Sequence, residues 1–153
     1  MSRLLVEGEA LRRGGEVQFR LEGWIDTAPF EDLLGMRIET AAEGRALLSM
    51  PFTVQLAQGG GLLHGGALTA LADTAVAIAI KTLLPEGTIF ATTELTTRFL
   101  APVREGRVTA AATVRGPEGR TLYGEAVVSD EEGREVVGFS SVFRLARGQG
   151  FDE

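Results

Sequence analysis

The chain has 153 residues, of which 44% are hydrophobic, with a net charge of −6 and a pI near 4.9. This length predicts one domain with its own core, and the acidic balance argues against a nucleic-acid binder, which usually carries a basic face. The absence of cysteine excludes disulfides, zinc thiolates and a cysteine nucleophile. Polar interruptions in the longest apolar stretch, residues 67–84, argue against a membrane span. No signal-peptide pattern is found, which together with the lack of cysteine favours a cytoplasmic location.

Residues 1–23 are expected to form an N-terminal arm outside the main domain. Within this arm, residues 17–21 alternate apolar and polar side chains, a period of two that is typical of a half-buried strand, so the arm has the pattern of an extra strand. The main domain is expected to span residues 24–147. Residues 148–153 are expected to form a polar tail.

The main domain carries two hydrophobic periodicities, one of helices and one of strands. A short helix is expected within residues 26–35, where Asp26 or Thr27 can serve as the N-cap and Pro29 suits the first turn. A long helix is expected over residues 65–84, because nearly every face of it is apolar or small, the pattern of a helix surrounded on most sides. Six strands are expected, at residues 36–40, 46–50, 92–100, 107–115, 121–129 and 135–145. The first two should form a hairpin and the last four an antiparallel meander. This order predicts an α+β fold in which one antiparallel sheet wraps one long helix.

Glycines surround the start of the long helix, in the stretch GGGLLHGG at residues 59–66. A helix start exposes unpaired backbone N–H groups and a partial positive charge, and glycine lets a substrate approach that backbone closely. Gly65 and Gly66 are therefore candidates for an oxyanion or phosphate site, although two glycines also permit a tight connection into the helix. No G-K-[ST] follows, so the stretch is not a P-loop.

Asp73 is the only ionisable side chain between His64 and Lys81. A carboxylate buried without a partner costs several kcal/mol or has a raised pKa, so a purely structural helix has little reason to hold one. Asp73 lies two turns beyond Gly65, roughly 12 Å along the axis, which is too far for both to act on one reacting group within one chain. Two chains packed antiparallel through this helix would bring Gly65 of one near Asp73 of the other. The alternative is a carboxylate that caps a neighbouring loop or bonds the backbone of a partner helix.

His64 is the only histidine of the chain. Histidine is the usual general base, but directly before a helix its ring can equally pack and bond a loop carbonyl. A nucleophilic triad is not indicated, because the chain has neither a G-x-S-x-G elbow nor a cysteine. One histidine without cysteine also cannot build a histidine-based metal site.

Two stretches of the chain carry a family resemblance, LHGGALTALADTA at residues 63–75 and TTELTTRFLAPVREG at residues 92–106. They resemble the hotdog-fold acyl-CoA thioesterases, in particular the phenylacetate-pathway and 4-hydroxybenzoyl-CoA thioesterase-like branch. The order of elements is similar over residues 26–146. An acid nine residues after the histidine of H-G-G is fairly specific to this branch. Members with a glutamate there often carry a threonine one turn later, and because this position is Ala77, the chain looks like the aspartate-type subgroup.

The resemblance implies an active site shared between two chains. The two sheets would join side by side in a homodimer, and two dimers would pair into a tetramer. The Gly65 N–H would polarise a thioester carbonyl, Asp73 of the facing chain would be the nucleophile or general base, and Gln58 would help to orient water or the thioester. Thr92 falls where some members carry a serine or threonine near the acid. Further substrate contacts, including those to the phosphates of coenzyme A, are expected from His64, Gly66, Thr92, Phe99, Arg98, Arg115 and Arg120.

The expected activity is hydrolysis of a small or medium acyl-CoA, with aromatic acyl groups favoured by the family likeness. Coenzyme A is part of the substrate, so no separate cofactor is expected, and neither is a nucleic-acid or membrane partner. Two alternatives use the same fold. One is a non-catalytic acyl-CoA-binding module, and the other is a hotdog dehydratase acting on acyl carrier protein. The dehydratase needs a catalytic histidine with a helix acid, and a histidine within H-G-G substitutes poorly for it.

Overall fold

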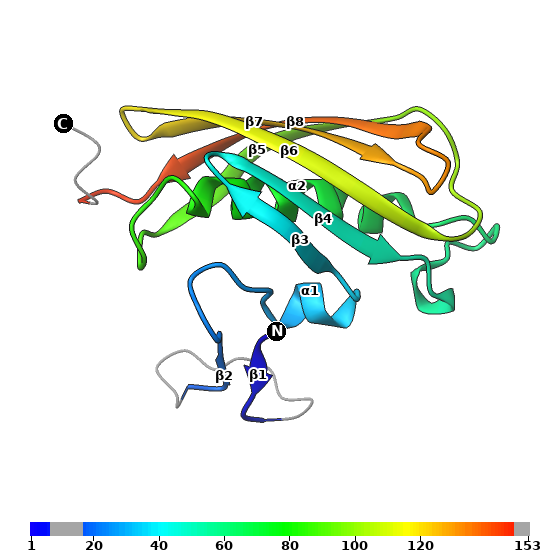
Figure 1. Ribbon diagram of the computed structural model, residues 1–153, viewed down its shortest axis with the longest axis horizontal. Coiled ribbons are helices and arrows are strands. Elements are labelled where there is room, and N and C mark those ends of the chain that lie inside the picture. Colours follow the sequence, from blue (N-terminus) through cyan, green and yellow to red (C-terminus); the bar gives the residue numbers. More distant parts are fainter. Residues whose placement is uncertain (7–16, 149–153) are drawn as a thin grey trace.

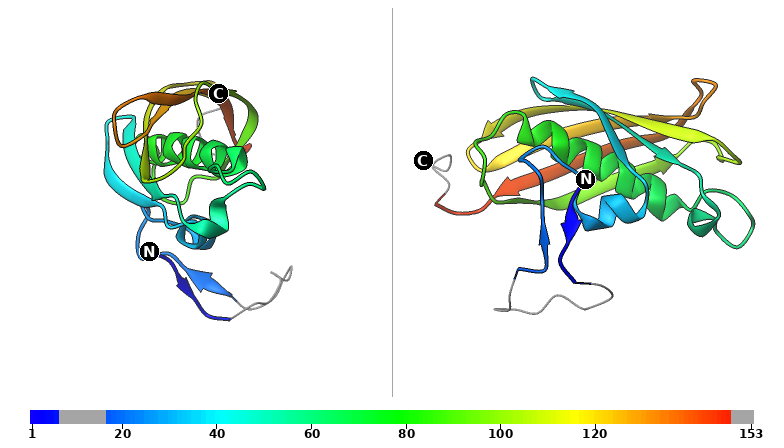
Figure 2. Two further views of the ribbon diagram at one scale, coloured as in Figure 1. Left: turned by 90° about the vertical axis from the view of Figure 1, so that its right-hand side faces the viewer. Right: turned by 60° about the horizontal axis from the view of Figure 1, so that its bottom comes forward.

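The computed structural model describes residues 1–6 and 17–148 of the chain. A six-stranded antiparallel sheet curves around one long helix, α2 (Gly65–Lys81), which lies along its inner face (Figures 1 and 2). The strands of this sheet are β3 (Arg37–Ala42), β4 (Arg45–Pro51), β5 (Phe90–Phe99), β6 (Arg107–Glu118), β7 (Thr121–Ser129) and β8 (Glu135–Leu145). This arrangement confirms the α+β fold with one sheet wrapped on one long helix.

The strand order is β3-β4-β6-β7-β8-β5, which corrects the predicted four-stranded meander. Only β6, β7 and β8 form a meander. β5 pairs with β8, from Phe90 opposite Leu145 to Phe99 opposite Val137, and not with β6. The physical reason is the path of the chain, since α2 crosses the inner face of the sheet and delivers β5 to the far edge. On its other side β5 has no strand partner among the described residues.

The core lies between α2 and the inner face of the sheet. Gly124 of β7 is the point of closest approach, because a Cβ atom there would lie 2.2 Å from a methyl carbon of Val76. A glycine at this position therefore lets the helix backbone come close to the sheet. The helix buries Ala67, Leu68, Leu71, Ala72, Ala75, Val76, Ile78, Ala79 and Ile80. Burial of each large apolar side chain is worth about 1.5–3 kcal/mol, so this face holds α2 in place.

α2 ends at Lys81, three residues before the predicted end at residue 84. The cause is Thr82, whose hydroxyl donates to the Ala79 carbonyl at 2.6 Å and accepts from the Gly44 N–H at 2.7 Å. These bonds satisfy a carbonyl at the helix end and tie it to the turn between β3 and β4. The chain therefore leaves the helix axis before it reaches Leu84 and Pro85.

Trp24 and Lys81 fasten the segment before the sheet to the end of α2. The indole N–H of Trp24 donates to the Lys81 carbonyl at 2.9 Å, and the Lys81 ammonium donates to the Trp24 carbonyl at 3.0 Å. The same ammonium lies 4.7 Å from the centre of the indole ring, in reach of a cation–π interaction. Burial lowers the pKa of Lys81, while Glu31 and Asp26 act in the opposite direction.

The short helix α1 (Pro29–Leu33) has Ala28 as its N-cap, with no side-chain capping bond. The prediction that Asp26 or Thr27 caps it is wrong. The reason is that Thr27 donates its hydroxyl to the carboxylate of Asp32, while Asp26 accepts from the N–H groups of Glu22 and Thr27. Both predicted caps are therefore engaged elsewhere.

The N-terminal segment contains a second, two-stranded sheet of β1 (Arg3–Leu4) and β2 (Phe19–Arg20). Figure 1 shows it below α1, away from the six-stranded sheet. A single 3₁₀ turn, η1 (Val54–Leu56), follows β4. Residues 7–16 of the predicted arm, and the predicted polar tail from residue 149 on, lie outside the described residues. Within the described part of the chain, no helix is long and apolar enough to cross a membrane.

Candidate active site

One stripe of α2 is not covered by the sheet. Its exposed or half-buried members recur every three or four residues and therefore share one helix face. They are Gly66, Thr69, Ala70, Asp73, Thr74 and Ala77. The edge strand β5 runs beside this stripe. The hydroxyls of Thr97 and Thr69 lie 3.1 Å apart, and the Thr92 hydroxyl donates to the carboxylate of Asp73 at 2.9 Å. The stripe and the edge strand thus form one surface.

Asp73 is half-buried, and Thr92 is its hydrogen-bond partner among the described residues. Burial raises the pKa of Asp73 above its ordinary value, because it removes water from the carboxylate, and the bond from Thr92 offsets part of this effect. A carboxylate with a raised pKa is a stronger base than a solvated aspartate. It is therefore better suited to take a proton from water or to attack a carbonyl carbon.

His64 caps the start of α2 and leaves one backbone donor free. The Gly66 N–H donates to Nδ1 of His64 at 2.8 Å, and the Ala67 N–H donates to the His64 carbonyl at 3.0 Å. The Gly65 N–H has no acceptor among the residues that the structure describes. Since Nδ1 accepts a hydrogen bond only when it carries no proton, the geometry gives His64 a capping role. It leaves the N–H of Gly65 available to a ligand.

Phe99 of β5 closes over Gly65. A Cβ atom at Gly65 would lie 3.0 Å from two ring carbons of Phe99, so a larger residue there would displace the ring. Gly65 and Phe99 line a cavity of about 400 Å³ together with Gln58. The side-chain oxygen of Gln58 accepts a hydrogen bond from the Gly60 N–H, which folds the amide back onto its own loop. The rest of the lining is mainly apolar: Leu62, Leu63, Leu68, Leu100, Ala101, Pro102 and Val103.

The structure brings together two separate groups of predicted site residues. Gln58, Gly65 and Phe99 share the cavity at the start of α2, whereas Asp73 and Thr92 meet two helical turns further on and do not line it. Two turns correspond to about 12 Å along the axis. One chain therefore holds the carboxylate of Asp73 and the cavity beside Gly65 at two separate places.

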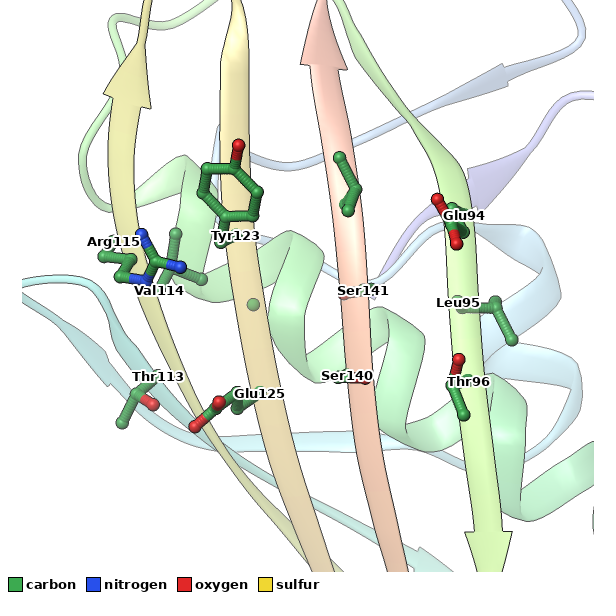
Figure 3. A pocket seen from close by; sticks show the side chains of 12 residues that line it. Glu94, Leu95, Thr96, Thr113, Val114, Arg115, Tyr123, Glu125, Ser140 and Ser141 are labelled. Carbon is green, nitrogen blue, oxygen red and sulfur yellow. The ribbon is translucent and has the colours of Figure 1, made fainter.

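The predicted phosphate-binding arginines lie apart from one another. Arg98 lies against Gly138 on the outer face of the sheet. Arg115 lies 4.4 Å from the ring centre of Tyr123 and 3.7 Å from Glu118. Figure 3 shows Arg115 and Tyr123 on the face of the sheet turned away from α2. Arg120 lies at the end of the sheet, where its Nε donates to the carbonyl of Leu145 at 3.0 Å.

Two features of the site were not found from the sequence. The Thr69–Thr97 hydroxyl pair joins α2 to β5, and no local pattern signals a contact between residues so far apart along the chain. The capping bond of His64 has a weak signal, its place directly before the helix, but histidine is not among the preferred N-caps. No group of three or more His, Cys, Asp or Glu residues that could hold a metal ion occurs in the described ranges.

The chain is similar in sequence and in structure to several known proteins. Residues 60–137 match the family model described as the thioesterase superfamily. The match includes α2, β5 and all but the first residue of the glycine-rich stretch. A putative esterase of Halobacterium salinarum is 28% identical over 137 residues, covering 83% of this chain and 91% of that protein. A 1,4-dihydroxy-2-naphthoyl-CoA hydrolase of Listeria monocytogenes is 30% identical over 102 residues, covering 66% of this chain and 82% of that protein. Among solved structures, the PaaI protein from the phenylacetic acid degradation operon of E. coli is similar with a TM-score of 0.72. It is 29% identical, and the match covers 80% of this chain and 87% of that chain.

Proposed function

This chain belongs to the thioesterase superfamily and is a thioester hydrolase with the hotdog fold, and we propose that it hydrolyses a small or medium acyl-CoA with Asp73 as nucleophile or general base. One observation carries the proposal. A half-buried carboxylate with a raised pKa lies two helical turns from a glycine N–H, at the start of the same helix, that has no acceptor among the described residues.

The chemistry needs a carboxylate and a polarised carbonyl. The Gly65 N–H donates to the thioester oxygen and stabilises the negative charge that develops on it. Asp73 then acts in one of two ways. As a general base it takes a proton from water, whose oxygen attacks the carbonyl carbon. As a nucleophile it attacks that carbon itself, forming an anhydride that water cleaves. In both routes the C–S bond breaks, the sulfur leaves as the thiolate of coenzyme A and takes up a proton, and the free acid remains.

Joining the two halves of the site requires a second copy of the chain. The edge of β5 that has no strand partner among the described residues is ten residues long, and Phe99 and Leu100 at its end are 58% and 56% exposed. An unpaired edge of this length is a template for another strand. Antiparallel pairing of two β5 strands about a two-fold axis would also set the two α2 helices antiparallel. Gly65 of one protomer would then face Asp73 of its partner, giving two sites per homodimer.

The acyl group is expected to be apolar and is proposed to be aromatic. The cavity next to Gly65 measures about 400 Å³ and is lined mainly by leucines, Val103 and Phe99. Apolar walls with a few polar groups are typical of sites that bind small apolar ligands. Two of the similar proteins are named for a naphthoyl-CoA substrate and for phenylacetic acid degradation, which supports an aromatic acyl group. Pairing of two dimers into a tetramer stays a prediction.

The experiment for this function is release of free thiol from a panel of acyl-CoA esters, with phenylacetyl, benzoyl, butyryl and octanoyl groups. We expect turnover of at least one ester, with the aromatic ones favoured in kcat/KM. Binding of acyl-CoA without thiol release would contradict hydrolysis and favour a binding module. Dehydration of a 3-hydroxyacyl group on acyl carrier protein, without hydrolysis, would contradict it in favour of a dehydratase.

The Thr92 hydroxyl is expected to lower the pKa of Asp73. Thr92→Val keeps the shape of the side chain but removes the bond that lowers the pKa of Asp73, so that pKa should rise further. The acid limb of the kcat/KM profile should therefore move to higher pH, and kcat should fall about tenfold, within the range for perturbed proton transfer. The matched control is Thr93→Val, because the Thr93 hydroxyl donates to the Val142 carbonyl instead. Identical pH profiles for wild type and Thr92→Val would contradict the assignment.

A further inference from the structure

The edge strand β5 carries two opposite charges on the face of the sheet turned away from α2. Glu94 lies in register with Val142 of β8 and Arg98 with Gly138, and both charged side chains are exposed. Figure 3 shows the Glu94 side chain on this outer face. Neither charge has an ion-pair partner among the described residues. Along an extended strand the two residues are roughly 13 Å apart, which is too far for them to pair within one chain.

Thr96 lies midway between the two parts of the candidate site when positions on β5 are counted by their partners along β8. Phe99, which closes over Gly65, lies three rungs of the β5–β8 ladder after Thr96. Thr92, which bonds to Asp73, lies four residues before Thr96, but the bulge that follows Thr92 removes one rung. Thr92 and Phe99 are therefore equally distant from Thr96, and both lie on the face toward α2.

A two-fold axis limits the registers in which two β5 strands can pair. The axis stands normal to the joined sheet, so each residue points to the same face in both protomers. Residues directly opposite each other must also share a face, because side chains alternate along each strand. The axis must therefore pass through a residue and not between two. An axis through Thr96 sets Thr92 of one protomer opposite Phe99 of its partner, because the two are equally distant from it.

The same axis sets opposite charges across from each other. With Thr96 on the axis, Glu94 of each protomer lies opposite Arg98 of its partner, on the outer face and twice per dimer. Side chains directly opposite each other on antiparallel strands have Cβ atoms about 4.5–5.5 Å apart, within reach of an ion pair. An axis through Leu95 or Thr97 would leave each charge opposite an uncharged side chain. The spacing of the site and the placement of the charges therefore select one register.

We propose that Glu94 of each protomer pairs with Arg98 of its partner, and that these two ion pairs fix the register in which the β5 strands join. The inference rests on the proposed function, because it names the contacts that align the shared site of that homodimer. Both side chains lie on the face away from α2, so they act on the site through the strand and not on the substrate. Glu94 and Arg98 are therefore positioning residues. Opposite charges across from each other favour this register over its neighbours.

The register is tested by cysteine cross-linking, because the chain has no cysteine of its own. Thr96→Cys puts the two thiols of a dimer across the axis, with Cα atoms about 4.5–5.5 Å apart, within the range of a disulfide. Leu95→Cys and Thr97→Cys are the matched controls, since in this register each cysteine lies diagonal to its copy, about 7–8 Å away. On non-reducing gels after mild oxidation, we expect Thr96→Cys to form the covalent dimer about tenfold faster than either control. A control that cross-links as fast or faster would overturn the register, and so would equally slow cross-linking of all three.

Charge reversal tests the ion pairs themselves. Glu94→Arg sets arginines opposite each other twice per dimer, so the dimer Kd measured by sedimentation equilibrium should rise about tenfold or more. The double variant Glu94→Arg with Arg98→Glu restores opposite charges and should restore the Kd. The matched control is Glu125→Arg, an exposed glutamate on the same face of the central strand β7, which should keep the Kd within about twofold. An unchanged Kd in Glu94→Arg, or a raised Kd that the double variant does not restore, would overturn the proposal.

Both experiments separate this inference from the proposed function, because neither needs hydrolysis. If Thr96→Cys cross-links as expected and the charge swap restores the Kd, the register stands even where no ester is cleaved. If esters are cleaved but the charge swap has no effect, the ion pairs are refuted and the proposed function stands.

Discussion

Replacement of Asp73 by asparagine is expected to lower kcat by at least about 100-fold, the scale of a lost general base. Asparagine keeps the size of the side chain and can still accept the hydrogen bond from Thr92, but it can neither take a proton nor attack the thioester. KM should change little, because the carboxylate acts mainly in the transition state. The measurement is thiol release at saturating acyl-CoA, beside a check that the variant remains folded. A variant with full activity would remove Asp73 from the mechanism.

The same substitution is expected to leave stability unchanged or to increase it at neutral pH. Burial raises the pKa of Asp73 above its ordinary value of 3.8, so the folded state holds this proton more tightly than the unfolded state does. The contribution of Asp73 to stability is therefore fully present below the ordinary pKa and is lost as pH rises through the raised folded pKa. Denaturant unfolding of both proteins across this pH window should show that the free energy of unfolding falls less with rising pH in Asp73→Asn than in wild type. A larger loss in the variant would contradict the burial account.

Replacement of Gly65 by alanine is expected to lower kcat by about 100-fold or more, as for loss of an oxyanion-hole donor. The added methyl group would lie 3.0 Å from the ring of Phe99, so the ring or the helix start must move. Either movement shifts the free N–H away from the thioester oxygen or blocks the approach to it. Thiol release with the best ester of the panel measures the effect.

The controls for this prediction separate the lost donor from a general effect of glycine substitution. Gly59→Ala lies in the same loop with no heavy atom within 4 Å of the added methyl, so it should keep full activity. The double variant Gly65→Ala with Phe99→Ala removes the clash and should be more active than Gly65→Ala when each is scaled to its parent. If Gly65→Ala alone retains wild-type activity, the helix start does not hold the thioester.

The helices and strands could be predicted from the sequence where a local pattern determines them. The pairing of strands that are distant in the sequence could not. The alternation of side chains and the glycine-containing turns place β6, β7 and β8 correctly as a meander. The same pattern puts β5 next to β6, whereas it pairs with β8, because the path of α2 across the sheet decides that neighbour. The end of α2 was missed for a similar reason, since Thr82 bonds to Gly44, almost forty residues away.

The same distinction between local pattern and distant contacts applies to the candidate site. Asp73 could be singled out because it is an isolated acid in an apolar helix, and the structure places it in a half-buried environment that raises its pKa. Its role in catalysis stays a prediction. It could not be predicted from the sequence that Arg120, Arg144 and Arg147 line one cavity. The pairing of β7 with β8 brings them together. The roles of Gly65, Gln58 and Thr92 in catalysis stay predictions, and the substitutions above test two of them directly.

The central claim is that one active site takes Gly65 from one protomer and Asp73 from its partner. It is tested most directly by co-expressing Asp73→Asn and Gly65→Ala chains with different affinity tags and purifying the mixed dimer. One of its two sites would then carry both substitutions and the other neither, so the mixed dimer should recover about half of the wild-type activity, although each parent is nearly inactive. A mixed dimer no more active than the average of its parents would contradict the shared site and place Gly65 and Asp73 in one chain.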